Sequence, residues 1–350
     1  MNAPMREVTV THLQRRPIPG FHSVERLFED VRLELRGSGI SIRTRINQFT
    51  SNGFLPRLRD AWAARRAQSQ VNHVTGDVHY LTWWLDRRRT VLTVLDCVGL
   101  TRTRGWRRAL FKYLWYTIPV KRSRYITVIS EFTRAELVRE TGCDPEKILI
   151  IHPHLSEEFI RIDKPFNQVR PRILQVGTTP NKNIERLAEA LSGMQVDLVI
   201  IGNLSWEQRA ALDRAGVNVI EKSGLSREQI VEEYIGADIV AFVSTYEGFG
   251  LPIIEAQAIG RPVVTSNCCS MPEVAADAAS IVNPIDVGQI RAAFERLILD
   301  RRHRESMIAR GFKNAERFRL NAIAQQYAEL YRRVVAQNDV THNEKCQSAH

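Results

Sequence analysis

Two glutamates on either side of a glycine-rich turn mark the part of the sequence best suited to chemistry. Residues 244–264 read STYEGFGLPIIEAQAIGRPVV, with Glu247 before the turn and Glu255 in the apolar stretch after it. The glycines allow close approach of the backbone to a ligand, and Pro252 suits the first turn of a helix. A helix N-terminus presents free amides and a positive dipole end, which suit phosphate. Because carboxylates bind the vicinal hydroxyls of a ribose, the stretch predicts a phosphate held between two hydroxyl-bearing rings.

A second loop carries a lysine suited to a diphosphate. Gly177 follows the apolar run RILQV and opens the sequence GTTPNKN, in which Lys182 can direct an ammonium group at phosphate. Taken alone, Lys182 could be a solvated loop residue, and the two glutamates could be a helix-capping carboxylate and a surface charge. The combination of an apolar run, a glutamate, GFGLP and a second glutamate is more specific than any one part of it, and it favours a ligand site.

Short apolar runs precede both loops and recur along the chain, alternating with longer amphipathic stretches. This alternation predicts parallel, doubly wound α/β sheets, and it occurs twice, so we expect two Rossmann-like domains. Ligands of such sheets bind outside the carboxyl ends of the strands, where both loops lie. The expected strands are residues 7–13, 42–46, 71–75, 90–96, 125–130 and 148–152 in the first half and 172–177, 197–202, 217–220, 238–244, 262–266 and 279–282 in the second.

The boundary between the domains is predicted near KPFNQVRPR (164–172), a polar stretch with two prolines that lies between two strand-like runs. The first domain would then cover residues 1–165 and the second residues 166–337. The last helical pattern, 321–337, is a candidate for packing back on the first domain. The polar tail, residues 338–350, is expected to be loose.

The composition limits the class of protein. The chain has 350 residues, of which 44% are hydrophobic and 25% charged, as is ordinary for a globular protein. No apolar run reaches the ~18 residues of a membrane-spanning helix, and the first residues lack the apolar core of a secretory signal. Five cysteines without CxxC spacing indicate neither a disulfide framework nor a zinc site. These features predict a cytoplasmic protein.

Positive charge is concentrated in the first half. Residues 1–165 contain 28 Lys and Arg against 17 Asp and Glu, whereas residues 166–350 contain 21 against 22, so we expect an anionic partner for the first half. Cations and large aromatics interleave over residues 102–124, within a stretch without acidic residues. Read as a helix over 104–117, this composition suits an anionic membrane surface, but a core-packed helix with a basic face is equally compatible with it. A nucleic-acid partner is disfavoured, because nothing else resembles an RNA- or DNA-binding module.

The longer sequence STYEGFGLPIIEAQAIGRPVVTSNCCSMPEVAADAASIVNPID resembles the signature of the group 1 (family 4) retaining glycosyltransferases. Three further segments resemble the same family in the same order: SRYITVISEFTRAELVRETGCDPEKILIIHP, QVGTTPNKNIERLAEAL and GLSREQIVEEYIGADIVAFVS. The likeness covers roughly residues 70–335. It implies a GT-B fold, in which two Rossmann-like domains face a cleft. The first domain would take the acceptor, the second would take a nucleotide-diphosphate sugar, and the anomeric configuration would be retained.

The resemblance also implies roles for individual residues. Glu255 would hold the ribose, Glu247 would contact the transferred sugar, and Lys182 would neutralise the diphosphate together with the amides around Gly250 and Leu251. The loop at 222–225 would lie near the base. The expected donor-binding residues are Gly177, Thr178, Thr179, Lys182, Lys222, Gly224, Leu225, Glu247, Gly248, Phe249, Gly250, Leu251 and Glu255.

Two positions depart from the family pattern. Thr178 stands where many relatives have an arginine, so more of the phosphate charge falls on Lys182. Leu95 stands where many relatives have a histidine, in a motif whose aspartate is retained as Asp96, and His79 is the candidate substitute for that histidine. Since no two aspartates have D-x-D spacing, we expect a metal-independent site without a cofactor. The expected catalytic residues are Glu247, Lys182, His79 and Asp96.

Together these features predict a glycosyltransferase that moves a hexose from a nucleotide-diphosphate sugar to a lipid-linked or cell-surface glycan, peripherally bound at the inner face of the cytoplasmic membrane. One alternative is a subunit that binds a nucleotide sugar without turnover, which the departure at Leu95 motivates. The other is a nucleotide-sugar 2-epimerase of the same architecture.

Overall fold

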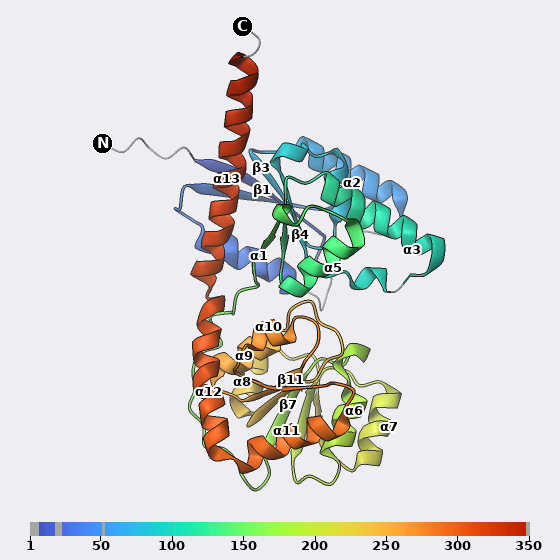
Figure 1. Ribbon diagram of the computed structural model, residues 1–350, viewed down its shortest axis with the longest axis vertical. Coiled ribbons are helices and arrows are strands. Elements are labelled where there is room, and N and C mark those ends of the chain that lie inside the picture. The colour runs from blue at the N-terminus through green and yellow to red at the C-terminus, as the bar shows by residue number, and fades with distance from the viewer. Residues whose placement is uncertain (1–6, 18–22, 51–52, 102, 348–350) are drawn as a thin grey trace, which may run out of the picture. The chain divides into compact units, whose positions relative to one another are not determined.

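The computed structural model describes residues 7–17, 23–50, 53–101 and 103–347. The chain forms two compact units, each built around one parallel sheet (Figure 1). Unit 1 comprises Met1–His154 together with Leu320–His350, and unit 2 comprises Leu155–Arg319.

Unit 1 contains a six-stranded parallel sheet in the order β2-β1-β3-β4-β5-β6. Its strands are β1 (Val8–Gln14), β2 (Ile40–Ile46), β3 (Val71–Thr75), β4 (Thr90–Val94), β5 (Tyr125–Val128) and β6 (Ile148–Ile150). Its helices are α1 (Ser23–Glu34), α2 (Phe54–Arg66), α3 (Gly105–Lys112), α4 (Ile118–Lys121), α5 (Glu131–Thr141) and the last helix of the chain, α13 (Leu320–Gln347). A π-helical turn, Tyr113–Thr117, joins α3 to α4.

Unit 2 contains a second six-stranded parallel sheet, in the order β12-β11-β10-β7-β8-β9. Its strands are β7 (Arg172–Val176), β8 (Asp197–Ile201), β9 (Asn218–Lys222), β10 (Ile239–Phe242), β11 (Val263–Ser266) and β12 (Ser280–Val282). Its helices are α6 (Ile184–Leu191), α7 (Trp206–Ala215), α8 (Arg227–Gly236), α9 (Leu251–Ile259), α10 (Met271–Ala275), α11 (Val287–Leu299) and α12 (Arg301–Ala315).

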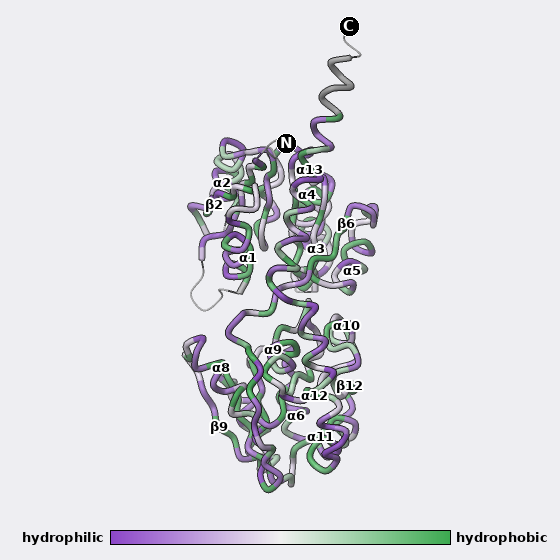
Figure 2. Tube along the Cα trace, turned by 90° about the vertical axis from the view of Figure 1, so that its left-hand side faces the viewer, coloured by the Kyte–Doolittle hydropathy of each residue, from purple (hydrophilic) through white to green (hydrophobic). Residues whose placement is uncertain are grey.

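All twelve strands expected from the apolar runs are present, and the expected α/β class is confirmed. Every residue of β4, β10 and β11 is buried, as strands covered by helices on both faces should be. The covering helices need only one apolar face, and hydrophobic and hydrophilic residues alternate along α11 in Figure 2. Burial of the apolar strands therefore sets the sheets, and their carboxyl ends fix where the loops lie.

The last helix completes unit 1. Figure 1 shows α13 running beside β1, β3 and α1, with which it is in contact. The hydroxyl of Tyr331 lies 2.9 Å from Nε2 of His12 and 2.8 Å from Nδ1 of His73, so a buried polar network joins α13 to β1 and β3. The helix continues to Gln347. The prediction that residues 338–350 form a loose tail is therefore wrong for residues 338–347.

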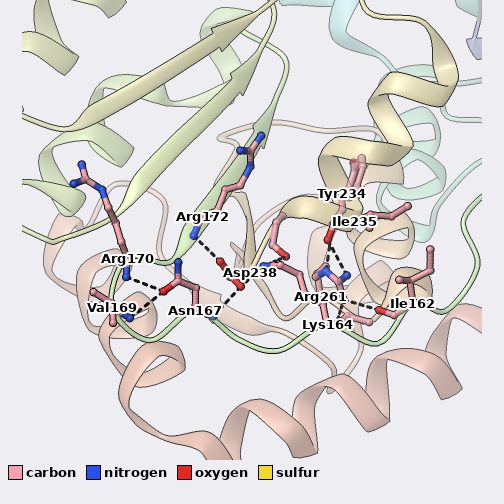
Figure 3. Close-up of polar contacts among 12 residues, drawn as sticks. Ile162, Lys164, Asn167, Val169, Arg170, Arg172, Tyr234, Ile235, Asp238 and Arg261 are labelled. Carbon is pink, nitrogen blue, oxygen red and sulfur yellow. Dashed lines mark hydrogen bonds and ion pairs between the residues drawn. The ribbon is translucent and has the colours of Figure 1, made fainter.

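Asp238 anchors the segment before β7, residues 162–172, to the rest of unit 2 (Figure 3). Its carboxylate, just before β10, accepts hydrogen bonds from the backbone amides of Asn167 and Arg172 at 3.1 and 2.8 Å and from the ammonium group of Lys164. Asp238 is buried, so its charge needs these partners.

Arg261 anchors the same segment from a second side (Figure 3). This buried guanidinium donates to the carbonyl oxygen of Ile162 at 3.0 Å and to those of Tyr234 and Ile235 in α8 at 3.2 and 2.9 Å. Because both anchors tie residues 162–172 to unit 2, the division of the chain falls between His154 and Leu155 and not after residue 165, where the polar sequence suggested it.

Candidate active site

The loops after β7 and β10 meet at the carboxyl edge of the unit 2 sheet. β7 and β10 are neighbours, with β8 and β9 continuing the sheet on one side and β11 and β12 on the other. Such a switch in strand order is the place where open α/β sheets bind ligands. The backbone amide of Thr245 donates to the carbonyl oxygen of Asn181 at 2.8 Å and joins the two loops.

Lys182 and Glu247 form an ion pair across these loops. Nζ of Lys182 lies 2.8 Å from Oε1 of Glu247 and 4.4 Å from the centre of the Phe242 ring. The side-chain amide of Asn181 donates to the same carboxylate oxygen at 3.1 Å. The side chains of Lys182 and Glu247 are 14% and 18% exposed. Two residues predicted to act on the donor are therefore adjacent, in a place that is sheltered and still reachable from solvent.

Two glycines leave room for the side chains around this pair. Gly177 has φ of +87°, and a Cβ at this position would lie 2.9 Å from Cε of Lys182. Gly250 has φ of +122° and precedes α9, where a Cβ would lie 3.1 Å from Cδ1 of Ile253. Pro252 lies in the first turn of α9, and no side chain at Gly250 caps that turn. The positive end of the helix is thus presented beside Lys182 and Glu247.

Glu255 lies on the next turn of α9 and is only 8% exposed. Its Oε2 accepts a hydrogen bond of 2.7 Å from the hydroxyl of Tyr234, and its Oε1 lies 3.7 Å from Nη1 of Arg227. Burial raises the pKa of Glu255, whereas the bond from Tyr234 and the charge of Arg227 oppose that rise. One carboxylate oxygen is therefore fixed, and the other has no hydrogen-bond partner among the described residues.

Sequence reasoning missed Tyr234 and Arg227. Tyr234 lies in the last turn of a stretch whose sequence predicts an ordinary helix, and Arg227 begins the same helix. Both face Glu255 only because α8 packs against α9. The ring of Phe159 contacts the ring of Tyr234 and lies under the guanidinium of Arg227, so it packs against both partners of Glu255. No local signal in the sequence joins residues that far apart.

The loop at 222–225, expected near the base of the nucleotide, begins at the end of β9. Lys222 pairs with Glu233, which also pairs with Arg172. Burial alone would raise the pKa of Glu233, but these two cations outweigh it and lower that pKa. The charge of Lys222 is thus balanced within unit 2. Gly224 is exposed with φ of +68°, and Leu225 is half-buried.

The other expected donor-binding residues shape the two loops. Thr178 packs on Gly202, and a Cβ at Gly202 would lie 2.8 Å from Cγ2 of Thr178. Thr179 precedes the 3-10 turn that carries Lys182. Phe249 is buried, with its ring against Phe318. Gly248 lies between Glu247 and Phe249, and Leu251 is the first residue of α9.

Asp96 and His79 belong to unit 1 and lie in different surroundings. Asp96 follows β4 at the carboxyl edge of that sheet, is half-buried, and accepts a hydrogen bond of 3.0 Å from the backbone amide of Val98. His79 is 3% exposed, with Nδ1 2.8 Å from the carbonyl oxygen of Trp115, and burial lowers its pKa. This core position gives no support to the prediction that His79 replaces the missing histidine.

The basic and aromatic stretch divides into two parts. Trp115 and Tyr116 pack around His79 and Tyr80, as a core reading predicts. By contrast α3 has no buried residue, and Trp106, at 72% exposed, lies on it. Leu110 and Tyr113, four and seven positions further on, are also exposed. Arg102 lies outside the described residues. None of the helices in the described ranges is long and apolar enough to span a membrane.

Comparisons with known proteins agree with this architecture. Residues 156–314 match the family model described as Glycosyl transferases group 1. The chain is 28% identical over 306 residues to O-antigen chain mannosyltransferase B of Escherichia coli, covering 78% of this chain and 77% of that protein.

Solved structures share the fold. WaaG, a glycosyltransferase involved in lipopolysaccharide biosynthesis, superposes with a TM-score of 0.69 at 18% identity, covering 92% of this chain and 99% of that one. HepE from Anabaena, in complex with UDP and glucose, gives a TM-score of 0.73 at 16% identity over 92% and 99% of the two chains. Residues 156–314 therefore resemble the group 1 glycosyltransferases, and the chain as a whole shares the GT-B fold of these solved structures.

Proposed function

We propose that the chain transfers a hexose from a nucleotide-diphosphate sugar bound to unit 2 and retains the anomeric configuration of that sugar. The observation that carries the proposal is the Lys182–Glu247 pair at the switch point of the sheet, beside the start of α9. An ammonium group and helix amides suit a diphosphate, and the nearby carboxylates suit the rings on either side of it.

The diphosphate is proposed to lie between Lys182 and the first turn of α9. Lys182 then exchanges its contact with Glu247 for a phosphate oxygen, and the amides of Gly250 and Leu251 meet further negative charge. That charge grows as the sugar–phosphate bond breaks, so donors fixed in place stabilise the transition state more than the bound substrate. Once released from the lysine, Glu247 can face the sugar, where positive charge develops.

Glu255 is proposed to hold the ribose. Because Tyr234 occupies Oε2, Oε1 is the oxygen left to accept the ribose hydroxyls. Arg227, 3.7 Å from Oε1, favours the ionised form that can accept them. The base would then lie toward the loop at 222–225.

The acceptor is proposed to be a glycan carried by a lipid, with α3 of unit 1 touching an anionic membrane surface at the cytoplasmic face. The support is the exposed row formed by Trp106, Leu110 and Tyr113, flanked by cations such as Arg107. Sedimentation with anionic and with neutral vesicles tests this part. Equal binding of both kinds of vesicle, or wild-type binding by a triple alanine variant of the row, would refute it.

The donor is proposed to carry mannose, since curated relatives are named as mannosyltransferases. A thermal-shift panel of UDP-, GDP- and ADP-sugars, each with mannose and with glucose, tests donor class and sugar together, because a ligand that binds only the folded chain raises its Tm. A mannose donor should give the largest shift. No shift with any nucleotide sugar would overturn the proposal.

The products of the reaction separate transfer from its alternatives. Transfer releases a free nucleoside diphosphate and yields a glycoside, whose anomeric configuration proton NMR can compare with that of the donor. A 2-epimerase would return an altered nucleotide sugar, and a binding subunit would return the donor unchanged. Inversion of the anomeric centre would refute the retaining assignment while leaving transfer intact.

A further inference from the structure

Two adjacent cysteines lie beside the proposed donor loop and have no part in the proposed transfer. Cys268 and Cys269 follow β11 at the carboxyl edge of the unit 2 sheet, and both are half-buried cysteines outside any disulfide. Cys269 has φ of +57°, one of three positive values at non-glycine positions among the described residues. The left-handed conformation of this residue is unfavourable for a cysteine, so surrounding contacts must hold the pair in place.

Both sulfur atoms converge on one point of the donor loop. Sγ of Cys268 lies 3.6 Å and Sγ of Cys269 3.9 Å from the carbonyl oxygen of Thr245. Sγ of Cys268 also lies 3.8 Å from the carbonyl oxygen of Ser244. The neighbouring Cys269 thiol, followed by burial, raises the pKa of the Cys268 thiol. The pair therefore directs both thiols at the same carbonyl oxygen.

The next residue connects the cysteines to the carboxylate of the site. The hydroxyl oxygen of Ser270 lies 3.0 Å from the carbonyl oxygen of Glu247 and 2.6 Å from that of Phe249. Residues 268–270 thus hold the backbone of the donor loop at Thr245, Glu247 and Phe249. A group bound to both sulfurs replaces the protons that they donate to Thr245, and the loss of these bonds acts on the loop that carries Glu247.

We propose that Cys268 and Cys269 form a dithiol site that chelates a soft trivalent centre such as an organic arsenical, and that its occupation weakens donor binding. Thiol sulfur is the ligand type that soft, thiophilic centres select. The proposed effect on the donor rests on the proposed function, whereas the chelation does not.

A bridging atom suits this pair better than a direct disulfide. Neighbouring Cα atoms are about 3.8 Å apart, less than the roughly 4.4–6.8 Å found across disulfides, and an arsenic atom between the sulfurs widens the ring. An arylarsenoxide, R–As=O, reacts with two thiols to give R–As(S–)₂ and one water. Two As–S bonds replace the bonds from arsenic to oxygen, both thiol protons leave with that oxygen, and arsenic remains trivalent.

Phenylarsine oxide added to the full chain tests the site by intact mass. We expect one phenylarsine group per wild-type chain, stable in at least tenfold excess of a monothiol and removed by a dithiol such as 2,3-dimercaptopropanol. Cys268→Ser and Cys269→Ser should each lose the monothiol-resistant adduct. Cys143→Ser and Cys346→Ser are the matched controls and should keep it. A stable adduct in either of the first two variants, or its loss in a control, would overturn the assignment.

Donor affinity tests the link to the loop. Calorimetry with the nucleotide sugar selected by the thermal-shift panel should show at least tenfold weaker binding to the arsenical-bound wild-type chain than to the free chain. Cys269→Ser exposed to the same reagent should bind donor as before, and it should unfold at the wild-type Tm. Equal donor affinity with and without the arsenical refutes the link. If no nucleotide sugar binds even the free chain, the proposed function fails, while the mass measurement still decides whether the dithiol site exists.

Discussion

Replacing Tyr234 by phenylalanine tests how Glu255 is kept fit to hold a ribose. The hydroxyl of Tyr234 donates 2.7 Å to Oε2 of a carboxylate that is 8% exposed. A hydrogen bond to a charged group contributes roughly 1.5–3 kcal/mol, and about 1.4 kcal/mol corresponds to a factor of ten. A loss of about 2 kcal/mol therefore predicts a decrease of about 30-fold in kcat/KM for the donor.

The same substitution changes the pH dependence. Burial raises the pKa of Glu255 and the bond from Tyr234 opposes that rise, so removal of the hydroxyl raises this pKa further. The acid limb of the rate profile should move to higher pH, because only the ionised carboxylate accepts both ribose hydroxyls. Stability should also fall more above that pKa than near pH 4, where the carboxyl is protonated in the folded chain and largely so in the unfolded chain.

Initial rates at varied donor concentration across about pH 5–9 measure both effects. Tyr113→Phe, assayed without vesicles, is the matched control, since this tyrosine is exposed on unit 1, and its donor kinetics should equal those of the wild type. If Tyr234→Phe keeps the wild-type kcat/KM with an unmoved acid limb, then the hydroxyl does not maintain an ionised Glu255, and the reasoning fails.

Further predictions concern charge, packing, protonation and metal. Lys182→Met should lower kcat/KM roughly 100- to 1000-fold, the range for loss of one donor to a developing negative charge, as measured by release of nucleoside diphosphate. Arg261→Lys should lower the free energy of unfolding of unit 2 by about 2 kcal/mol in a urea titration, since an ammonium group cannot replace a guanidinium that bonds carbonyls in α8 and in the segment before β7. Lowering the pH from 7 to 5 should cost unit 1 about 2 kcal/mol for His73 alone, because burial lowers its pKa to about 3 while the unfolded chain takes up the proton near 6.5. Turnover should persist in excess EDTA, as expected for a site that meets the diphosphate charge with Lys182 and helix amides.

Each of these predictions has a control and an outcome that contradicts it. Lys313→Met and Arg301→Lys change exposed residues of α12 and should leave turnover and stability unchanged. Full activity in Lys182→Met would remove the lysine from the proposed mechanism. In His73→Gln the loss of stability between pH 7 and 5 should shrink, and an unchanged loss would assign the effect to other groups. Activity abolished by EDTA and restored by one divalent ion would end the metal-independent proposal.

The strands and the loop positions were predictable from local sequence, because each depends on a short apolar run or on glycine and proline in a turn. β10 and the GFGLP turn illustrate this. The burial of β10 follows from its own apolar residues, and the backbone conformation of the turn follows from its own glycines. Lys182 and Glu247 were predicted separately, and their contact follows from the neighbouring positions of β7 and β10.

What escaped prediction depends on packing between distant elements. Tyr234 reaches Glu255 because α8 lies against α9, and the boundary of unit 2 depends on the buried Arg261. Composition could not divide the aromatic stretch into core and surface either. Trp115 and Trp106 are the same residue type nine positions apart. Only the packed structure shows that Trp115 is partly buried against Tyr80 and that Trp106 is exposed.

The assignment of α13 to unit 1 has a consequence for biosynthesis. Unit 2 is one continuous stretch of chain, so all of it is synthesised before α13. Unit 1, although it begins first, must wait until α13 has been made before Tyr327 and Tyr331 can cover Phe28, His12 and His73. A released chain truncated after residue 319 would therefore contain all of unit 2 but lack the helix that covers unit 1, whose uncovered apolar surface is a target for chaperones.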